Sequence, residues 1–247
     1  MNLVIILFFC MLGSLGSVGL AAVILLVPPK FTNRIVPVLV AYATGTLLGA
    51  AFLGLIPEAL NHLPAISLMP VILAGILVFF LLEKILLWRH CHDNQCPVHE
   101  TSGLLILFGD AFHNFVDGVI IAASFLISPS IGIAAALAVI AHEIPQELGD
   151  FIILLQSGYS RGRALLLNAL SGSTTLLGGL LAFLFFQRIN TALPYVTAVS
   201  AASFIYIALA DLIPGHRRNV SPASTILQLV LMLVGIGTIA LFDAHAH

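Results

Sequence analysis

Charged residues are scarce in this chain, at only 8% of its 247 residues. A soluble domain usually carries about 25%, so the composition excludes an ordinary cytosolic enzyme. Nine Lys and Arg stand against eleven Asp and Glu, which excludes a nucleic-acid-binding protein. Three cysteines provide no disulfide framework. Apolar residues, in contrast, make up 60% of the chain, and the mean hydropathy of +1.12 excludes a disordered one.

Long apolar runs account for this composition. A membrane-spanning helix needs about 20 predominantly apolar residues, and eight runs of about that length are joined by short connections rich in Pro, Gly, Ser and Asn. The first run lacks a basic leading segment and is too long for a signal peptide, so we expect it to be retained. The sequence predicts an all-α integral membrane protein whose residues 1–247 form a single transmembrane domain. The eight expected transmembrane helices are 3–27, 37–60, 70–88, 104–127, 131–155, 164–186, 195–214 and 224–242.

Basic residues fall almost entirely on one side of this predicted protein. Cytoplasmic loops of membrane proteins carry an excess of Lys and Arg. Eight of the nine basic residues share one side: Lys30, Arg34, Lys84, Arg89, Arg161, Arg163, Arg217 and Arg218. Only Arg188 lies on the other side. We therefore expect the side with eight basic residues to be cytoplasmic and, because the number of spans is even, both termini to be outside.

A short echo relates the second and seventh runs. The second ends Leu55-Ile56-Pro57 and the seventh ends Leu212-Ile213-Pro214. Many transporters contain repeats of inverted topology. Eight spans allow a 3+2+3 arrangement, in which spans one to three and six to eight form an inverted repeat around spans four and five.

Seven of the carboxylates inside the apolar runs have no Lys or Arg mid-span to neutralise them. They are Glu58, Asp110, Asp117, Glu143, Glu147, Asp150 and Asp211. An ionised carboxylate near the bilayer centre costs roughly 2.5–3.5 kcal/mol even on a lenient scale. These groups must therefore be protonated, hydrated or neutralised by a bound cation, which indicates a site for metal ions or protons.

Most of these carboxylates belong to two polar stripes, each on one face of a helix because its members are three, four or seven residues apart. The stripe of the fourth span consists of Asp110, His113, Asn114 and Asp117. The stripe of the fifth span consists of His142, Glu143, Gln146, Glu147 and Asp150. Imidazole with carboxylate suits Zn, Fe, Mn or Cd better than a calcium-type oxygen cage. The stripes predict one coordination site between spans four and five.

Three residues within or beside the stripes affect helix geometry. Pro145 has no N–H to donate to the carbonyl of Ala141, so we expect the fifth helix to open locally, as suits an ion path. Gly118 and Gly149 are expected to permit close approach of neighbouring helices.

Other interpretations of these polar residues remain open. Intramembrane His and Asn often form hydrogen bonds between helices, although nine polar groups exceed what packing requires. Asp110 and Asp150, at the stripe ends, are either entrance groups or partners that orient ligands. Glu58 and Asp211 lie near helix ends, where a carboxylate can reach interfacial water.

A catalytic alternative also remains. The zinc-protease motif H-E-x-x-H is excluded because Gln146 stands where its second His would be. An intramembrane zinc-dependent hydrolase built from His113, His142 and a carboxylate base is not excluded, although no nucleophile motif supports it.

Two further segments carry metal-binding residue types. The predicted cytoplasmic loop 89–103 contains His90, Cys91, His92, Cys96 and His99, which fit either a transient metal-receiving site or an ordinary polar loop. The tail 243–247 ends Asp243-Ala244-His245-Ala246-His247 and either catches metal weakly or frays.

The two stripes closely resemble the ZIP (ZRT/IRT-like) family of divalent-metal transporters. The resemblance rests on two motifs: His113-Asn114-Phe115-Val116-Asp117-Gly118 and His142-Glu143-Ile144-Pro145-Gln146-Glu147-Leu148-Gly149-Asp150-Phe151. Eight spans, outward termini and a His-containing loop between spans three and four extend it over the whole chain.

The resemblance implies a binuclear metal site between helices four and five. One position would use His113, Asp117, His142 and Gln146. The other would use Asn114 and Glu143, and it would be approached by a polar residue of span six, either Asn168 or Ser171. The implied mechanism is an elevator-like displacement of a helix group that contains spans four and five.

Three positions depart from the family pattern. Relatives often have His where this chain has Gln146, a weaker neutral donor that would lower affinity or favour harder ions. They often have His at the position of Gly54, and an acidic residue at that of Gly215.

These observations together predict a divalent transition-metal importer rather than an enzyme. The expected metal-binding residues are His113, Asn114, Asp117, His142, Glu143, Gln146 and Glu147. Zn²⁺ is the foremost transported substrate, with Cd, Fe or Mn as others, and no cofactor is expected. We expect divalent metal ions and membrane lipid as partners and exclude nucleic acid, while homodimer formation is left open. The expected location is the cell (inner) membrane.

Overall fold

The computed structural model describes residues 3–88, 100–186, 190–213 and 221–244, and all of its described elements are helices. They are α1 (Leu3–Met11), η1 (Leu12–Gly16), α2 (Ser17–Ile24), α3 (Pro29–Gly49), η2 (Ala50–Leu55), α4 (Ile56–His62), α5 (Ala65–Trp88), α6 (Glu100–Ile127), α7 (Pro129–Gln156), α8 (Arg161–Gly172), α9 (Thr174–Phe186), η3 (Asn190–Ala192), α10 (Leu193–Tyr206), η4 (Ile207–Leu212) and α12 (Pro222–Ala244).

Eight of the described stretches are long and apolar enough to cross a membrane, which confirms the prediction of an all-α protein with eight spans. In order, spans one to eight are Leu3–Ile24, Arg34–His62, Ala65–Ile85, Leu107–Ile127, Pro129–Leu155, Arg161–Phe186, Leu193–Ala210 and Pro222–Phe242. Span three begins before the expected residue 70, because Pro70 lies inside α5 rather than at its start.

Serines in the connections cap the N-termini of α7 and α8. The Ser128 hydroxyl accepts from the Ile131 N–H at 3.2 Å ahead of α7, and the Ser160 hydroxyl accepts from the Arg163 N–H at 3.4 Å ahead of α8. Such caps satisfy backbone donors that have no partner within the helix. They fix where spans five and six begin.

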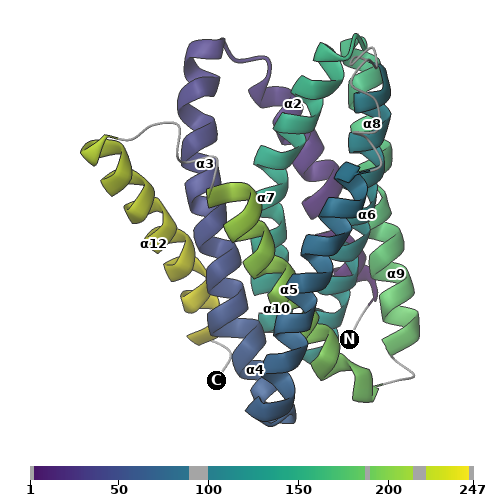
Figure 1. Cartoon of the computed structure of the whole chain (residues 1–247), viewed down its shortest axis with the longest axis vertical. Coiled ribbons are helices and arrows are strands. Elements are labelled where there is room, and N and C mark those ends of the chain that lie inside the picture. The colour runs from purple at the N-terminus through teal and green to yellow at the C-terminus, as the bar shows by residue number, and fades with distance from the viewer. Residues whose placement is uncertain (1–2, 89–99, 187–189, 214–220, 245–247) are drawn as a thin grey trace.

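The spans pair in a symmetric way. Span four packs against span six, and in the same way span five packs against span one. Span two packs against span eight, and in the same way span seven packs against span three. Exchanging one with six, two with seven, three with eight and four with five maps these pairs onto each other. Figure 1 shows α12 at one edge beside α3 and α9 at the opposite edge. The pairing is the one expected for a 3+2+3 inverted repeat.

Burial follows the same symmetry. The hydropathy windows of spans two and five are each 61% buried and those of spans four and seven 56%, whereas spans three and eight are only 17% and 11% buried. Spans two, four, five and seven therefore form the inside of the protein.

The echo between spans two and seven marks a matching irregularity of the backbone. The wide π-helical turns η2 and η4 end at Leu55 and Leu212, the leucines of the two Leu-Ile-Pro sequences. A third wide turn, η1, lies in span one. α7, in contrast, is continuous through the buried Pro145, so the expected opening of this helix is not present as a wide turn. Wide π-helical turns such as η1, η2 and η4 often occur at functional sites.

Span four approaches span six closely through Gly118. A Cβ placed on Gly118 would stand 1.9 Å from the carbonyl oxygen of Thr175, a distance that no side chain can adopt. The expectation for Gly118 is therefore met. A Cβ on Gly149 would have no atom within 4 Å among the described residues, so Gly149 mediates no such contact.

Candidate metal centre

The polar stripes of α6 and α7 face each other. The Nε2 atoms of His113 and His142 lie 3.1 Å apart, and their rings meet edge to face. Asp117 Oδ2 lies 3.1 Å from His142 Nε2 and 3.6 Å from His113 Nε2. Glu143 Oε1 lies 3.5 Å from His113 Nε2 and 3.6 Å from His142 Nε2. We call these four residues the first ligand group.

The geometry around His142 leaves its lone pair pointing into this group. His142 Nδ1 lies 2.9 Å from the carbonyl oxygen of Ala138, which can only accept a hydrogen bond, so Nδ1 carries the proton. In the neutral ring Nε2 is then an acceptor. It faces a carboxylate oxygen and a second imidazole, an arrangement that either a shared proton or a bound cation would stabilise.

A second ligand group lies beside the first. It consists of Asp110, Glu143 and Glu147, all buried, and one oxygen from each lies within 4.8 Å of the others. The same 4.8 Å limit holds for the ligand atoms of the first group. Glu143 belongs to both groups, so its carboxylate stands where it could bridge two ions.

Charge in these groups is not balanced by the protein. Among the described residues, both carboxylate oxygens of Asp117, Glu143 and Glu147 are buried without a hydrogen-bond partner, and no Lys or Arg forms an ion pair with them. Leaving such groups unpaired in a low dielectric is costly. Two divalent cations would neutralise the four carboxylates of Asp110, Asp117, Glu143 and Glu147.

Neutral side chains orient Asp110. Asn114 Nδ2 donates to Asp110 Oδ1 at 3.0 Å and to its carbonyl at 3.2 Å, and Gln146 Nε2 donates to Oδ1 at 3.3 Å. The Ser171 hydroxyl of span six donates to Oδ2. Thr175 in turn donates to Asn114 Oδ1 at 2.9 Å. These amides and hydroxyls hold the carboxylate in place.

The structure thus divides the residues expected at the site. His113, Asp117, His142, Glu143 and Glu147 converge, whereas Asn114 and Gln146 contact Asp110 instead of the first ligand group. Asp110 was expected as an entrance or orienting group, and it lies among the carboxylates. The stripe periodicity included it, but only the packing of α7 and α8 against α6 shows what it faces.

Span six contributes through both residues considered for it. Ser171 bonds Asp110, and Asn168 Nδ2 donates to the carbonyl of Glu147 at 3.3 Å. Both side chains are buried. Asp150 is only half-buried, at the end of the fifth-span stripe.

Among the described residues, Glu58 and Gly54 show no contact with the two ligand groups. Glu58 bonds His62 at 3.2 Å and Asn61 at 3.1 Å within α4. Gly54 is buried, and a Cβ there would have no atom within 4 Å among the described residues. The side chain of Asp211, Gly215, residues 89–99 of the His/Cys loop and residues 245–247 of the tail lie outside the described residues.

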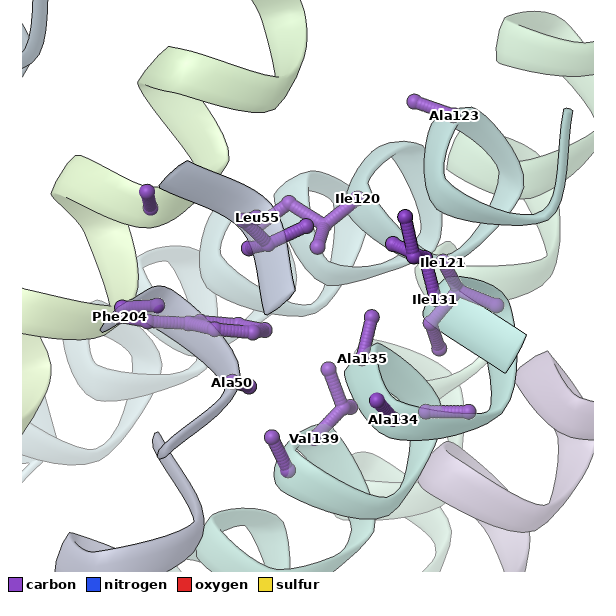
Figure 2. Packing of buried hydrophobic residues seen from close by; sticks show 14 of the residues in the cluster. Ala50, Leu55, Ile120, Ile121, Ala123, Ile131, Ala134, Ala135, Val139 and Phe204 are labelled. Atoms are coloured by element: carbon purple, nitrogen blue, oxygen red, sulfur yellow. The ribbon is translucent and has the colours of Figure 1, made fainter. Parts of the chain in front are cut away.

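An apolar cluster closes one side of the site. One turn beyond Asp117, Ile120 and Ile121 join residues of α7, η2 and α10 in a buried core (Figure 2). On the other side Gln146, Gly149 and Asp150 are only partly buried. The site is therefore sealed toward the junction of α6 and α7 and less covered toward the end of α7.

Comparisons with known proteins point to one family. A family model described as ZIP Zinc transporter matches residues 89–243. Zinc transporter ZIP13 of Pongo abelii is 34% identical over 224 residues, which cover 83% of this chain and 66% of the relative. Zinc transporter ZIP13 of Homo sapiens is 31% identical over 265 residues, covering 83% and 70%. The match to Zinc transporter ZIP13 of Danio rerio covers 42% of that relative, so this chain spans two thirds or less of the length of some of the proteins it resembles.

Proposed function

The chain belongs to the ZIP zinc transporter family, and on this premise we propose that it carries divalent transition-metal ions, zinc foremost and also Cd, Fe or Mn, across a membrane into the cytoplasm. The metal is the transported substrate, and no cofactor is part of the proposal. The family is one of transporters rather than enzymes, as the sequence predicted.

One observation carries the proposal. Two imidazole nitrogens and two carboxylate oxygens from α6 and α7 converge within 4.8 Å in a membrane-spanning bundle. Nitrogen together with carboxylate oxygen is the donor set that zinc and its neighbours favour. The convergence is easily explained if a cation occupies the space between these atoms.

We propose a binuclear site with a shared carboxylate. His113, Asp117, His142 and Glu143 would hold one ion, and Asp110, Glu143 and Glu147 the other. The all-oxygen second position would suit harder ions and weaker binding than the first. Asn114 and Gln146 would support it by orienting Asp110 rather than by direct coordination.

The direction of transport is proposed from charge. Arg161 and Arg163 lie at the start of α8, directly after the connection that follows α7. This is the side where the site is less covered. Loops rich in Arg and Lys are cytoplasmic in most membrane proteins. We therefore propose release to the cytoplasm, in a cell (inner) membrane, with both termini outside.

Helix pairing supports an elevator-like movement. Spans one, four, five and six pack with one another, and spans two, three, seven and eight form the other set. Spans two and eight also contact span five, and span seven contacts span four. The set that holds the ligand groups would slide along that contact. Lipid would cover the apolar outer faces of α5 and α12, and a homodimer remains a proposal.

Metal uptake by proteoliposomes that contain the purified protein tests this function. We expect Zn²⁺, Cd²⁺, Fe²⁺ and Mn²⁺ to enter, and we expect Asp117→Asn and His142→Ala to abolish uptake with unchanged reconstitution. Mg²⁺ serves as the metal control. Wild-type uptake in both variants would refute the site.

The hydrolase alternative makes a different prediction. It requires one tightly held zinc and release of product from a lipid or peptide, without metal flux. Tight metal binding without uptake would therefore lead to a search for product formation. Metal binding with neither uptake nor product formation would indicate a structural metal site.

A further inference from the structure

Span one carries two buried hydroxyls that do not bond to their own helix. A Ser or Thr inside a helix commonly donates to the carbonyl four residues earlier, as Thr44 does to Val40 at 2.8 Å and Ser200 to Val196 at 2.8 Å. Ser14 is fully buried and Ser17 is 1% exposed, and neither hydroxyl has a hydrogen-bond partner among the described residues. Such orphaned groups call for a partner that the polypeptide does not supply.

Ser14 lies in the wide turn η1, on the part of span one that packs against α7 and α8. A π-helical turn interrupts the regular ladder of hydrogen bonds, and such turns are frequent at functional sites. The interruption coincides with the buried serine. Apart from Ser14 and Ser17, the residues of span one are Cys10, apolar residues and glycine.

Ser14 and Glu147 both lie close to the position that a Cβ on Gly172 would occupy. A Cβ built on Gly172 would stand 3.7 Å from Ser14 Cβ and 3.6 Å from Glu147 Oε1. Because residue 172 is glycine, the space between these two groups is left free. Its size is that of a methyl group in ordinary contact with both sides.

Asn168 completes the surroundings from one turn earlier on α8. Its Nδ2 donates to the backbone carbonyl of Glu147, which directs the amide toward that residue. Its Oδ1 is buried and has no hydrogen-bond partner within the described part of the chain. The Asn168 amide thus lies against Glu147 on the α8 side, and Ser14 of span one lies across Gly172 from the same residue.

We propose that the oxygens of Ser14, Glu147 and Asn168 form a further cation-binding position, beside the second ligand group on its span-one side. This inference deepens the proposed function, since the ion held there is the transported metal. The position contains oxygen ligands and a single carboxylate, so it binds a divalent cation less tightly than the nitrogen-containing first group. It is a transit position, and it makes span one a participant in the ion path.

A thiol at position 14 reports a cation directly. Ser14→Cys, in a background where Cys10, Cys91 and Cys96 are replaced, converts the hydroxyl into a soft ligand for Cd²⁺. Titration of the purified variant with Cd²⁺ is expected to produce the ultraviolet absorption of a cadmium–thiolate bond. Adding Glu147→Gln is expected to remove it. Ser200→Cys is the matched control, because Ser200 is a buried serine bonded within its own helix, and it is expected to give no such absorption.

Gly172→Ala tests the same position without changing a ligand. The added methyl makes only ordinary contacts at 3.5–3.7 Å, so the protein should fold, yet it fills the space between Ser14 and Glu147. We expect a severalfold loss of Zn²⁺ uptake relative to Gly19→Ala, whose Cβ has no described neighbour within 4 Å.

The outcomes separate this inference from the proposed function. Cadmium–thiolate absorption in Ser14→Cys that depends on Glu147 supports the position even if the wild-type protein transports no metal. Absence of that absorption while Cd²⁺ still binds elsewhere on the protein overturns the position, and so does full uptake by Gly172→Ala. In either case the region is only a hydrated gap between helices, and transport through the two ligand groups is unaffected.

Discussion

Glu143 is the residue on which both ligand groups depend. Its carboxylate lies within 3.6 Å of both imidazole nitrogens, and it also belongs to the group of Asp110 and Glu147. Asp117 and Glu147 each belong to one group only. If the site is binuclear, the loss of Glu143 must therefore affect both positions.

Glu143→Gln is expected to lower the number of bound Zn²⁺ ions from two toward zero, because the neutral amide removes the shared charge and one bridging oxygen. Metal content of the purified protein after equilibrium dialysis measures the change. His113→Ala is expected to weaken only the first position and leave one ion bound.

Glu58→Gln is the matched control for this experiment. Glu58 is likewise a carboxylate within a predicted span, but its partners are His62 and Asn61 of its own helix. Its variant should bind metal like the wild type. An unchanged content of two ions in Glu143→Gln would mean that the two groups do not share a ligand.

The helices α6 and α7 bring their stripes together only because the surrounding helices pack closely. α6 lies against α9 through Gly118, whose position leaves no space for a side chain. α9 also carries Thr175, which holds Asn114 and through it Asp110. Helix packing and ligand orientation are thus coupled at this contact.

Gly118→Ala is expected to destabilise the protein by about 1–3 kcal/mol or more, since overpacking at a backbone contact forces the helices apart. Thermal unfolding in detergent would show a lower midpoint, with metal uptake reduced as well. Gly19→Ala, with open space around its Cβ, should unfold like the wild type. Equal midpoints for the two variants would contradict the close approach of α6 and α9.

The whole molecule has a symmetric arrangement, and its proposed orientation in the membrane rests on charge. Spans pair as an inverted repeat requires, and the sequence predicts that every Lys and Arg except Arg188 lies on one side of the membrane. The ligand groups lie in the two central spans of this arrangement. Their less covered side is the one that bears Arg161 and Arg163.

Cysteines placed in two exposed connections test this orientation. In a background without the native cysteines, Thr191→Cys should react with a membrane-impermeant maleimide added to intact cells, whereas Ser160→Cys should react only after permeabilisation. Both positions are solvent-exposed, so both should react once the membrane is opened. The opposite pattern would reverse the proposed direction of transport.

The sequence by itself determined the class of this protein and the residue types of its candidate site. Apolar runs predict spans because a helix in lipid must satisfy its backbone internally and expose apolar side chains. Offsets of three, four and seven residues put the members of each stripe, His113 with Asp117 and Glu143 with Glu147 among them, on one helical face because the helical repeat is local. The Leu-Ile-Pro echo similarly indicated a repeat whose pairing the fold displays.

Tertiary structure decided which of these polar groups meet. Periodicity cannot tell whether Asp110 faces a ligand or an amide, because that depends on how α7 and α8 pack against α6. It likewise cannot show that Asn114 and Gln146 bond Asp110, that α7 continues through Pro145, or that Ser14 lies opposite Glu147 across Gly172. Contacts between residues far apart in the chain follow from the packing of whole helices, and a local pattern carries no record of that packing.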